Sequence, residues 1–354
     1  MKKTVDEAKL HQFLGQMLGD LGGALSVPLV RIGDRLGLYK ALHANGPMTP
    51  AQLAARTNIA ERYAREWLSH QAASGYLTYD SKTGTFTLPL EQAMVLADPD
   101  SPVYMQGGFD LAVTMIENQR FVEPAFRSGS GVGWGDQSPC LFCAAGRFFR
   151  PSYCNSLIAS WLPALDGVTA KLQRGATVAD VGCGHGFSTV IMAKAFPNST
   201  FIGYDFPPGS VEQARLHAEQ HGVTTNTRFE VALASEFPGK DFDLVTFFDC
   251  LHDMGDPVGA ARHVHQALKP DGSWMIVEPA AGDRLEDNLN PVSRLYYAAS
   301  TMICVPTSLD QPVGAALGAQ AGLKKLSTAI SEGGFSGVRK ATETPFNMIL
   351  EARP

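Results

Sequence analysis

Residues 177–205 hold the side chains whose types and spacing point most directly to chemistry. The text TVADVGCGHGFST runs on through VIMAKAFPNSTFIGYDF, which predicts a strand, a glycine loop, a helix and a second strand. Gly182, Gly184 and Gly186 would let the backbone turn sharply and let a ligand lie against the main chain, because glycine has no side chain. Asp180 and Asp205 end the two strands. This βαβ unit predicts a site for a nucleotide-containing cofactor.

The spacing of these groups separates two classes of cofactor. A dinucleotide-binding loop reads GxGxxG, whereas here the third glycine follows the second after one residue. A carboxylate at Asp180 would repel a pyrophosphate, but it suits the amino group of an amino-acid moiety and a nearby sulfonium. Asp205 can accept hydrogen bonds from both ribose hydroxyls, a feature that NAD and S-adenosylmethionine share. The pattern therefore favours S-adenosylmethionine over NAD.

Further cofactor contacts are expected where the other strands of the sheet end. The stretch after RFEV, from Ala232 to Ser235, is the place where an adenine would stack or receive main-chain hydrogen bonds. The candidates for these contacts are Phe206, Ala234, Ser235, Phe248 and Asp249.

Several segments, in this order, carry a resemblance to a known family. VADVGCGHG, the acid of GYD, FDLVTFFDCLHDMGDP and HQALKPDGSWMIVEP resemble the class I S-adenosylmethionine-dependent methyltransferases over roughly residues 150–354. Preceded by a winged helix, they are similar to O-methyltransferases of small aromatic hydroxyls and to mycobacterial and actinobacterial methyltransferases of unassigned substrate. The resemblance implies an α/β fold with a doubly wound, Rossmann-like seven-stranded sheet. It also implies a small-molecule substrate with an aromatic or polyketide-like hydroxyl.

The same resemblance implies a proton acceptor. The family's catalytic histidine falls on His252 in CLHDM and its supporting acid on Glu278 in IVEP, while Met254 stands where the family commonly has Trp. An imidazole just beyond a strand can take a hydroxyl proton near neutral pH, with an unperturbed pKa of about 6.5. His252 could instead cap a helix or bind a backbone carbonyl. Methyl transfer to nitrogen or sulfur, and a cofactor-binding regulator without turnover, are the alternatives for the whole chain.

The N-terminal third predicts a dimerising winged-helix domain. Apolar residues at helical spacing form one stripe from Leu10 to Leu21, which needs its own domain or a partner subunit to cover it. Thr49 and Pro50 begin a helix, a second follows over residues 60–74, and YLTYD, SKTG and TFTL predict a two-stranded wing. The expected domains are 1–92 (winged helix), 93–165 (helical linker and pocket segment) and 166–354 (catalytic), with a substrate-covering insertion at 280–315.

Substrate contacts are expected from two segments. Both are rich in aromatic residues, and the second interrupts the sheet beyond the carboxyl ends of its strands, where ligands bind in such folds. Ordinary core packing is the alternative for each side chain. The candidates are Trp134, Phe149 and Tyr153 in the first segment and Asn290, Tyr296, Tyr297 and Met302 in the second.

The composition of the chain limits the kinds of partner and the cellular location that we expect. The 354 residues carry a net charge of −6, and the second helix of the winged-helix pattern interleaves Arg62 and Arg65 with glutamates, so no nucleic acid is expected. No run of 18 apolar residues and no apolar leader is present, which predicts a cytoplasmic protein away from membranes. Cys140 and Cys143 form an isolated CxxC, so neither a metal site nor a disulfide is expected.

Overall fold

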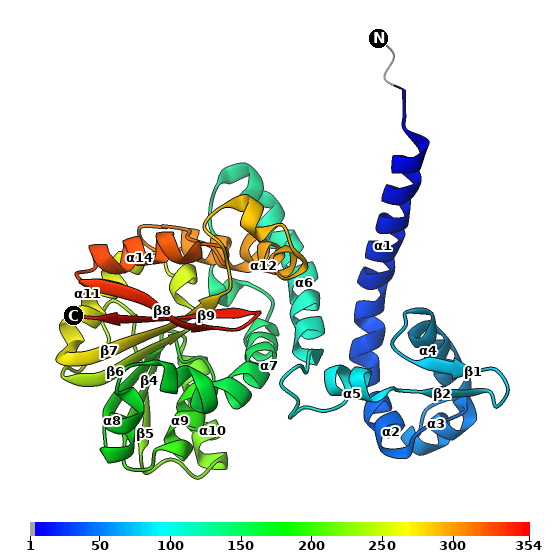
Figure 1. The fold of residues 1–354 in the computed structure, drawn as a ribbon, viewed down its shortest axis with the longest axis horizontal. Helices are drawn as coiled ribbons and strands as arrows, with labels where there is room; N and C mark the ends of the chain where they lie inside the picture. The colour runs from blue at the N-terminus through cyan, green and yellow to red at the C-terminus, as the bar shows by residue number, and fades with distance from the viewer. Residues whose placement is uncertain (1–3) are drawn as a thin grey trace. The chain divides into compact units, whose positions relative to one another are not determined.

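The computed structural model describes residues 4–354, and the chain divides into two compact units, Met1–Val113 and Thr114–Pro354 (Figure 1). The division falls within the segment 93–165 that was expected to link two domains, inside the long helix α6 (Gln106–Ser128). Each unit has a core of its own.

The first unit is the expected winged helix. Thr49 accepts a hydrogen bond from the Gln52 amide while the Gln52 side chain accepts one from the Thr49 amide, which fixes the start of α3. Strands β1 and β2 pair antiparallel, with Thr78 opposite Thr87. The elements are α1 (Glu7–Arg35), α2 (Leu38–Asn45), α3 (Pro50–Thr57), α4 (Glu61–Ala73), β1 (Thr78–Asp80), β2 (Thr85–Thr87) and α5 (Leu90–Leu96).

Helix α1 changes character along its length. Its buried residues lie in the second half, where Gly33 packs so closely on Trp67 that a Cβ there would come within 2.5 Å of the indole ring. In the first half the apolar stripe faces outward, with exposed fractions between 38% and 71%. That stripe consists of Leu10, Phe13, Leu14, Met17, Leu18 and Leu21. The first unit therefore leaves the stripe uncovered.

Helix α1 is also, within residues 4–354, the one helix whose length and composition would allow it to cross a membrane. Buried helices of soluble proteins and N-terminal leader segments meet the same criterion, so this is weak evidence.

The second unit is built on a seven-stranded sheet in the order β5-β4-β3-β6-β7-β9-β8. Strands β3 to β7 run parallel, and β9 inserts antiparallel between β7 and β8. This confirms the doubly wound, seven-stranded fold expected for the catalytic part of the chain. The strands are β3 (Thr177–Val181), β4 (Thr200–Asp205), β5 (Thr227–Val231), β6 (Phe242–Phe248), β7 (Leu268–Pro279), β8 (Gly337–Glu343) and β9 (Asn347–Arg353).

Two helical layers cover the sheet, because nearly continuous apolar strands need burial on both faces. One core cluster joins the strands to the helices around Leu172, Met192 and Val211, and the other joins them to the helices around Val264 and Ile330. The first layer comprises α8 (Val168–Arg174), α9 (Phe187–Ala195) and α10 (Pro208–Gln220), and the second α11 (Pro257–Ala267) and α14 (Gly322–Glu332) (Figure 1).

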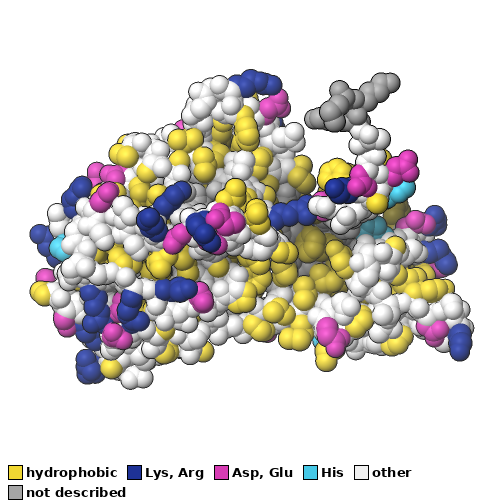
Figure 2. Space-filling model, turned by 45° about the horizontal axis from the view of Figure 1, so that its top comes forward, with side chains coloured by type: hydrophobic (Ala, Val, Ile, Leu, Met, Phe, Trp, Pro, Cys, Tyr) yellow, Lys and Arg dark blue, Asp and Glu magenta, His cyan; other side chains and the backbone are white. Residues whose placement is uncertain are grey.

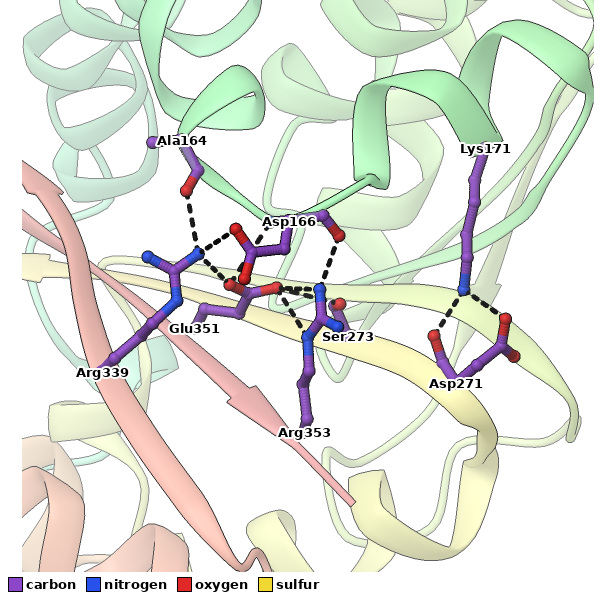
Figure 3. Close-up of polar contacts among 8 residues, drawn as sticks. All are labelled: Ala164, Asp166, Lys171, Asp271, Ser273, Arg339, Glu351 and Arg353. Carbon is purple, nitrogen blue, oxygen red and sulfur yellow. Dashed lines mark hydrogen bonds and ion pairs between the residues drawn. The ribbon is translucent and has the colours of Figure 1, made fainter.

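A buried carboxylate anchors the antiparallel edge. Glu351 on β9 is 1% exposed at its side chain and pairs with Arg339 and, at 2.9 Å, with Arg353, while Ser273 on β7 donates a hydrogen bond to it at 3.1 Å (Figure 3). Arg339 also pairs with Asp166, just before α8. These contacts lie at the end of the sheet opposite the carboxyl ends of the parallel strands, so they stabilise the edge without entering the site.

The surface carries mixed charge. On the face drawn in Figure 2, basic and acidic side chains are interspersed among apolar ones. On α4, Arg62 pairs with Glu66 and Arg65 with Glu61, so both arginines are already engaged by carboxylates.

Candidate active site

A cavity of about 210 Å³ opens where β3, β4 and β6 end. Its floor is the glycine loop, in which Gly182, Gly184 and Gly186 all have φ between 53° and 75°. A Cβ at Gly182 would lie 2.8 Å from the Cys250 sulfur, so this position requires both the left-handed backbone and the missing side chain. Gly182 and Gly184 line the cavity, whereas Gly186 is buried against Phe229 at the start of α9.

Asp205, at the end of β4, lines this cavity. Its Oδ2 accepts a hydrogen bond from the Gly184 amide at 2.6 Å, which joins the strand end to the glycine loop. Burial raises the pKa of the Asp205 carboxyl to about 6, although hydrogen bonds from the Gly184 and Phe206 amides oppose the shift. The carboxylate is therefore ionised above about pH 6 and can accept hydrogen bonds from ligand hydroxyls.

Asp180 does not face the cavity. It is fully buried, and it accepts hydrogen bonds from the hydroxyls of Ser188 at 2.7 Å, Thr189 at 2.5 Å and Thr246 at 3.0 Å. Burial raises its pKa, while these hydroxyls lower it. The expectation that Asp180 receives a ligand's amino group is corrected here, because its lone pairs are directed into the base of α9 and the sheet.

Asp249, just after β6, is a further acid that lines the cavity. It adopts φ 51°, accepts a hydrogen bond from the Tyr153 hydroxyl at 3.0 Å, and accepts another from the Asn347 side-chain Nδ2 at 2.9 Å. Burial and the nearby charge of Glu278 raise its pKa to about 8. Tyr153 also lines the cavity, and its own pKa is raised by burial and by Asp249.

His252 lies behind the cavity wall, in the 3-10 turn η4 (Leu251–Asp253), and is 3% exposed. Its Nδ1 lies 2.5 Å from Glu278 Oε2, and its Nε2 lies 3.1 Å from Asp253 Oδ1. Burial alone would lower the imidazole pKa, but Glu278 and Asp253 raise it well above the ordinary value. Asp253, not His252, is the member of the group that lines the cavity.

Comparison with known proteins identifies the unit around this cavity. Residues 172–329 match the family model described as a methyltransferase domain, and residues 23–98 match the Rv2258c-like winged HTH domain. The chain carries an S-adenosylmethionine-dependent methyltransferase domain. A ubiquinone biosynthesis O-methyltransferase of Pseudomonas paraeruginosa is 35% identical over 131 residues, 36% of this chain and 53% of that protein. The chain thus spans about half the length of the curated relatives it matches.

Solved structures share the fold over nearly the full length. Mitomycin 7-O-methyltransferase matches with a TM-score of 0.69 at 20% identity, covering 99% of this chain and 100% of that one. Human N-acetylserotonin methyltransferase, solved in complex with S-adenosylmethionine, matches with a TM-score of 0.68 at 17% identity, covering 100% and 99%. At these identities the likeness shows the fold.

Aromatic side chains also line the cavity in the methyltransferase domain. The expected Trp134, Phe149 and Tyr153 all line it. Phe142, which was not singled out, stands edge-on to Trp134 with ring centroids 5.5 Å apart and stacks on His185 at 6.1 Å. His185 had a signal in the sequence, since a residue between two glycines of the loop must border the ligand. Thr307, on α13 (Val305–Leu309), and Gln311, in the turn after it, also line the cavity. No pattern in the neighbouring sequence indicated this position.

The remaining cofactor candidates that line the cavity of the methyltransferase domain are Phe206, Ala234, Phe248 and Asp249. Leu233 lines it as well. Ser235 is exposed and does not line it.

None of the four candidates from 280–315 lines the cavity. Asn290 caps α12 (Pro291–Ala299) by accepting from the Ser293 amide. Tyr296 is buried and donates to the Phe346 carbonyl at 2.8 Å. Tyr297 borders a separate surface hollow, and Met302 is half-buried outside the cavity lining. The segment's helix packing, which was the alternative at each position, accounts for these placements.

Proposed function

We propose that this protein transfers a methyl group from S-adenosylmethionine to a hydroxyl of a small aromatic or polyketide-like molecule. One observation carries the proposal: the glycine loop and Asp205 line the same cavity as the aromatic side chains of Trp134, Phe142 and Phe149. A nucleoside and a flat acceptor can therefore meet in the same cavity, which is what direct transfer between them requires.

The glycine loop, Asp205 and the cavity residues next to them fit S-adenosylmethionine. Gly182 and Gly184 leave room for a ligand against the backbone, and Asp205 offers a carboxylate to ribose hydroxyls. Phe206, 48% exposed, and Leu233 provide apolar surface for an adenine. Asp249 lines the cavity and offers a carboxyl group to the amino group of the cofactor, the role first expected of Asp180. When bound, the cofactor supplies a methyl group activated on a sulfonium.

We further propose that His252 and Glu278 handle the hydroxyl proton. Glu278 is held in place because its Oε1 accepts from the Leu251 amide at 3.0 Å, and its Oε2 orients the imidazole. Asp253 stands between Nε2 and the cavity, so an acceptor's proton would reach His252 past that carboxylate. Positioning supplies most of the acceleration in such a reaction, and a base adds about 10² to 10⁴ in rate.

The decisive experiment measures methyl transfer from radiolabelled S-adenosylmethionine by the purified chain to a panel of phenols, aliphatic alcohols, amines and thiols. Turnover on phenols or related hydroxyls, with mass spectrometry placing the methyl on oxygen, supports the proposal. Transfer only to amines or thiols would replace it with N- or S-methylation. Cofactor binding without turnover, combined with a retarded DNA band in a shift assay, would favour a regulator.

We also propose a homodimer formed through the winged-helix unit, and a cytoplasmic location. The exposed stripe from Leu10 to Leu21 is a large apolar surface that a second copy would cover. No disulfide joins the six cysteines in the described part of the chain, in keeping with a reducing compartment.

A further inference from the structure

Thr307, which lines the cavity, ends a series of buried hydrogen bonds in the second unit. Gln137 Nε2 donates to Thr307 Oγ1 at 2.7 Å. Asn118 Nδ2 donates to Gln137 Oε1 at 2.7 Å, and the Ser138 amide donates to Asn118 Oδ1 at 2.7 Å. Asn118 lies on α6, Gln137 follows the turn η1 (Trp134–Asp136) and Thr307 lies on α13, so only the fold brings these three buried side chains together.

The Ser138 amide fixes the direction of every bond in this series. A backbone N–H can only donate, so the Asn118 atom that it contacts is the side-chain oxygen. The Asn118 nitrogen therefore donates to the Gln137 oxygen, which leaves the Gln137 nitrogen as the donor to Thr307. Thr307 Oγ1 is thus an acceptor in this bond, and its own hydroxyl hydrogen is left to be donated elsewhere.

No group in residues 4–354 takes the Thr307 hydroxyl hydrogen, because the Gln137 bond is the hydroxyl's one hydrogen bond there. Thr301, on the preceding turn η6 (Ser300–Cys304), behaves differently, since its hydroxyl donates to the Tyr297 carbonyl at 2.8 Å. A buried donor without an acceptor is unfavourable. Because Thr307 lines the cavity, a bound molecule can supply the acceptor.

We propose that Thr307 donates this hydrogen to an oxygen of the methyl acceptor that lies next to the hydroxyl to be methylated. The inference rests on the proposed transfer to a hydroxyl and adds the class of acceptor. That class is a phenol or enol that carries an ether, carbonyl or hydroxyl oxygen on the adjacent carbon.

The position of Thr307 beside Asp253 supports an adjacent oxygen. Gln311 Nε2 donates to the Asp253 carbonyl at 3.0 Å and to the Thr307 carbonyl at 3.1 Å, so one amide group holds the two cavity-lining residues together. Asp253 offers a carboxylate, which accepts hydrogen bonds, whereas Thr307 offers a donor. A hydroxyl and a neighbouring oxygen on one ring present the complementary pair of groups.

Discrimination between acceptors follows from the same bonds. A molecule that has a methylene group in place of the second oxygen leaves the Thr307 hydroxyl without a partner, and such a mismatch weakens binding. Gln137 and Asn118 do not line the cavity, so they act as positioning residues that orient the Thr307 hydroxyl.

The test compares two probes of nearly equal size, 2-methoxyphenol and 2-ethylphenol, in which an ether oxygen is replaced by a methylene group. Titration calorimetry measures their binding to the full chain saturated with S-adenosylhomocysteine. We expect the wild-type chain to bind 2-methoxyphenol about 2-fold to 10-fold more tightly. Thr307→Val keeps the shape of the side chain without the hydroxyl and should bind both probes equally. Gln137→Met should reduce the preference without changing a cavity residue.

The matched control is Thr301→Val, which removes an exposed threonine hydroxyl that is bonded within its own helical segment and should keep the preference. S-adenosylhomocysteine affinity and the melting temperature show whether each variant is folded. The proposal is overturned if the wild-type chain binds the probes equally or binds neither, or if folded Thr307→Val keeps the preference. A chain that prefers 2-methoxyphenol but transfers no methyl group would contradict the proposed function while supporting Thr307 as the donor.

Discussion

Asp205 offers the sharpest test of the cofactor site, because its carboxylate lies at the cavity and its pKa is raised to about 6. Asp205→Ala removes a charged acceptor from the ribose hydroxyls. Hydrogen bonds to charged groups contribute about 1.5 to 3 kcal/mol, so S-adenosylhomocysteine should bind about 10-fold to 100-fold more weakly. Titration calorimetry of the purified chain measures this directly.

The pH dependence of S-adenosylhomocysteine affinity is a second test of the Asp205 carboxylate. Because the folded-state pKa lies above the ordinary value, the ionised form that binds hydroxyls is complete above about pH 7 and is lost as the pH falls through 6. At pH 5 about one molecule in ten keeps the charge, so affinity should fall roughly tenfold. Asp205→Asn keeps an acceptor for the Gly184 amide but cannot ionise, and its affinity should be flat between pH 5 and 7.

The control is Glu219→Gln, which removes an exposed carboxylate from α10 and should leave both the affinity and its pH profile unchanged. Melting temperatures show whether the Asp205 variants keep the glycine loop folded. Unchanged affinity in Asp205→Ala, or a wild-type pH profile in Asp205→Asn, would refute the assignment of Asp205 to the ribose.

Four further outcomes are expected. His252→Ala should lower kcat about 10²-fold to 10⁴-fold while cofactor affinity is unchanged, and full turnover by this variant would exclude the base role. The rate of the wild-type protein should show no titration near pH 6.5, because the pKa of the His252 imidazole is raised. Asp180→Asn should lower the free energy of unfolding in urea by about 1 to 3 kcal/mol while calorimetry finds cofactor affinity intact, because its bonds are internal. Phe142→Ala should raise KM for the acceptor about tenfold and leave the cofactor Kd alone. Phe13→Glu with Met17→Lys should turn a dimer into a monomer in light scattering, whereas a wild-type monomer would contradict the dimer.

Short sequence patterns predicted the fold because the residues that start a helix or form a turn lie close together in the chain. Thr49 and Pro50 fixed the start of α3, and Gly182 through Gly186 fixed the strand-to-helix turn, since both depend on neighbours only a few residues away. The end of β4 likewise placed Asp205 at the cavity, because parallel strands bring their carboxyl ends to one edge of the sheet.

Local sequence patterns did not predict the direction in which each side chain points. Asp180 ends a strand as Asp205 does, yet it turns into the hydroxyls of Ser188 and Thr189, which only the packing of α9 reveals. Asn290 and Tyr296 carry the right chemistry for a pocket, but Asn290 caps its own helix and Tyr296 donates a hydrogen bond to the Phe346 carbonyl. The approach of Cys304 to His252 depends on tertiary structure alone, so no spacing rule could have found it.

The position of β9 has a consequence for biosynthesis. This strand pairs with both β7 and β8, yet it follows every other strand along the chain. Until the ribosome has delivered residues 347–353, the apolar strand β7 lacks its partner on that side and presents an open edge. Nascent chains paused before that point expose a surface prone to aggregation, so the sheet should close late and depend on chaperones meanwhile.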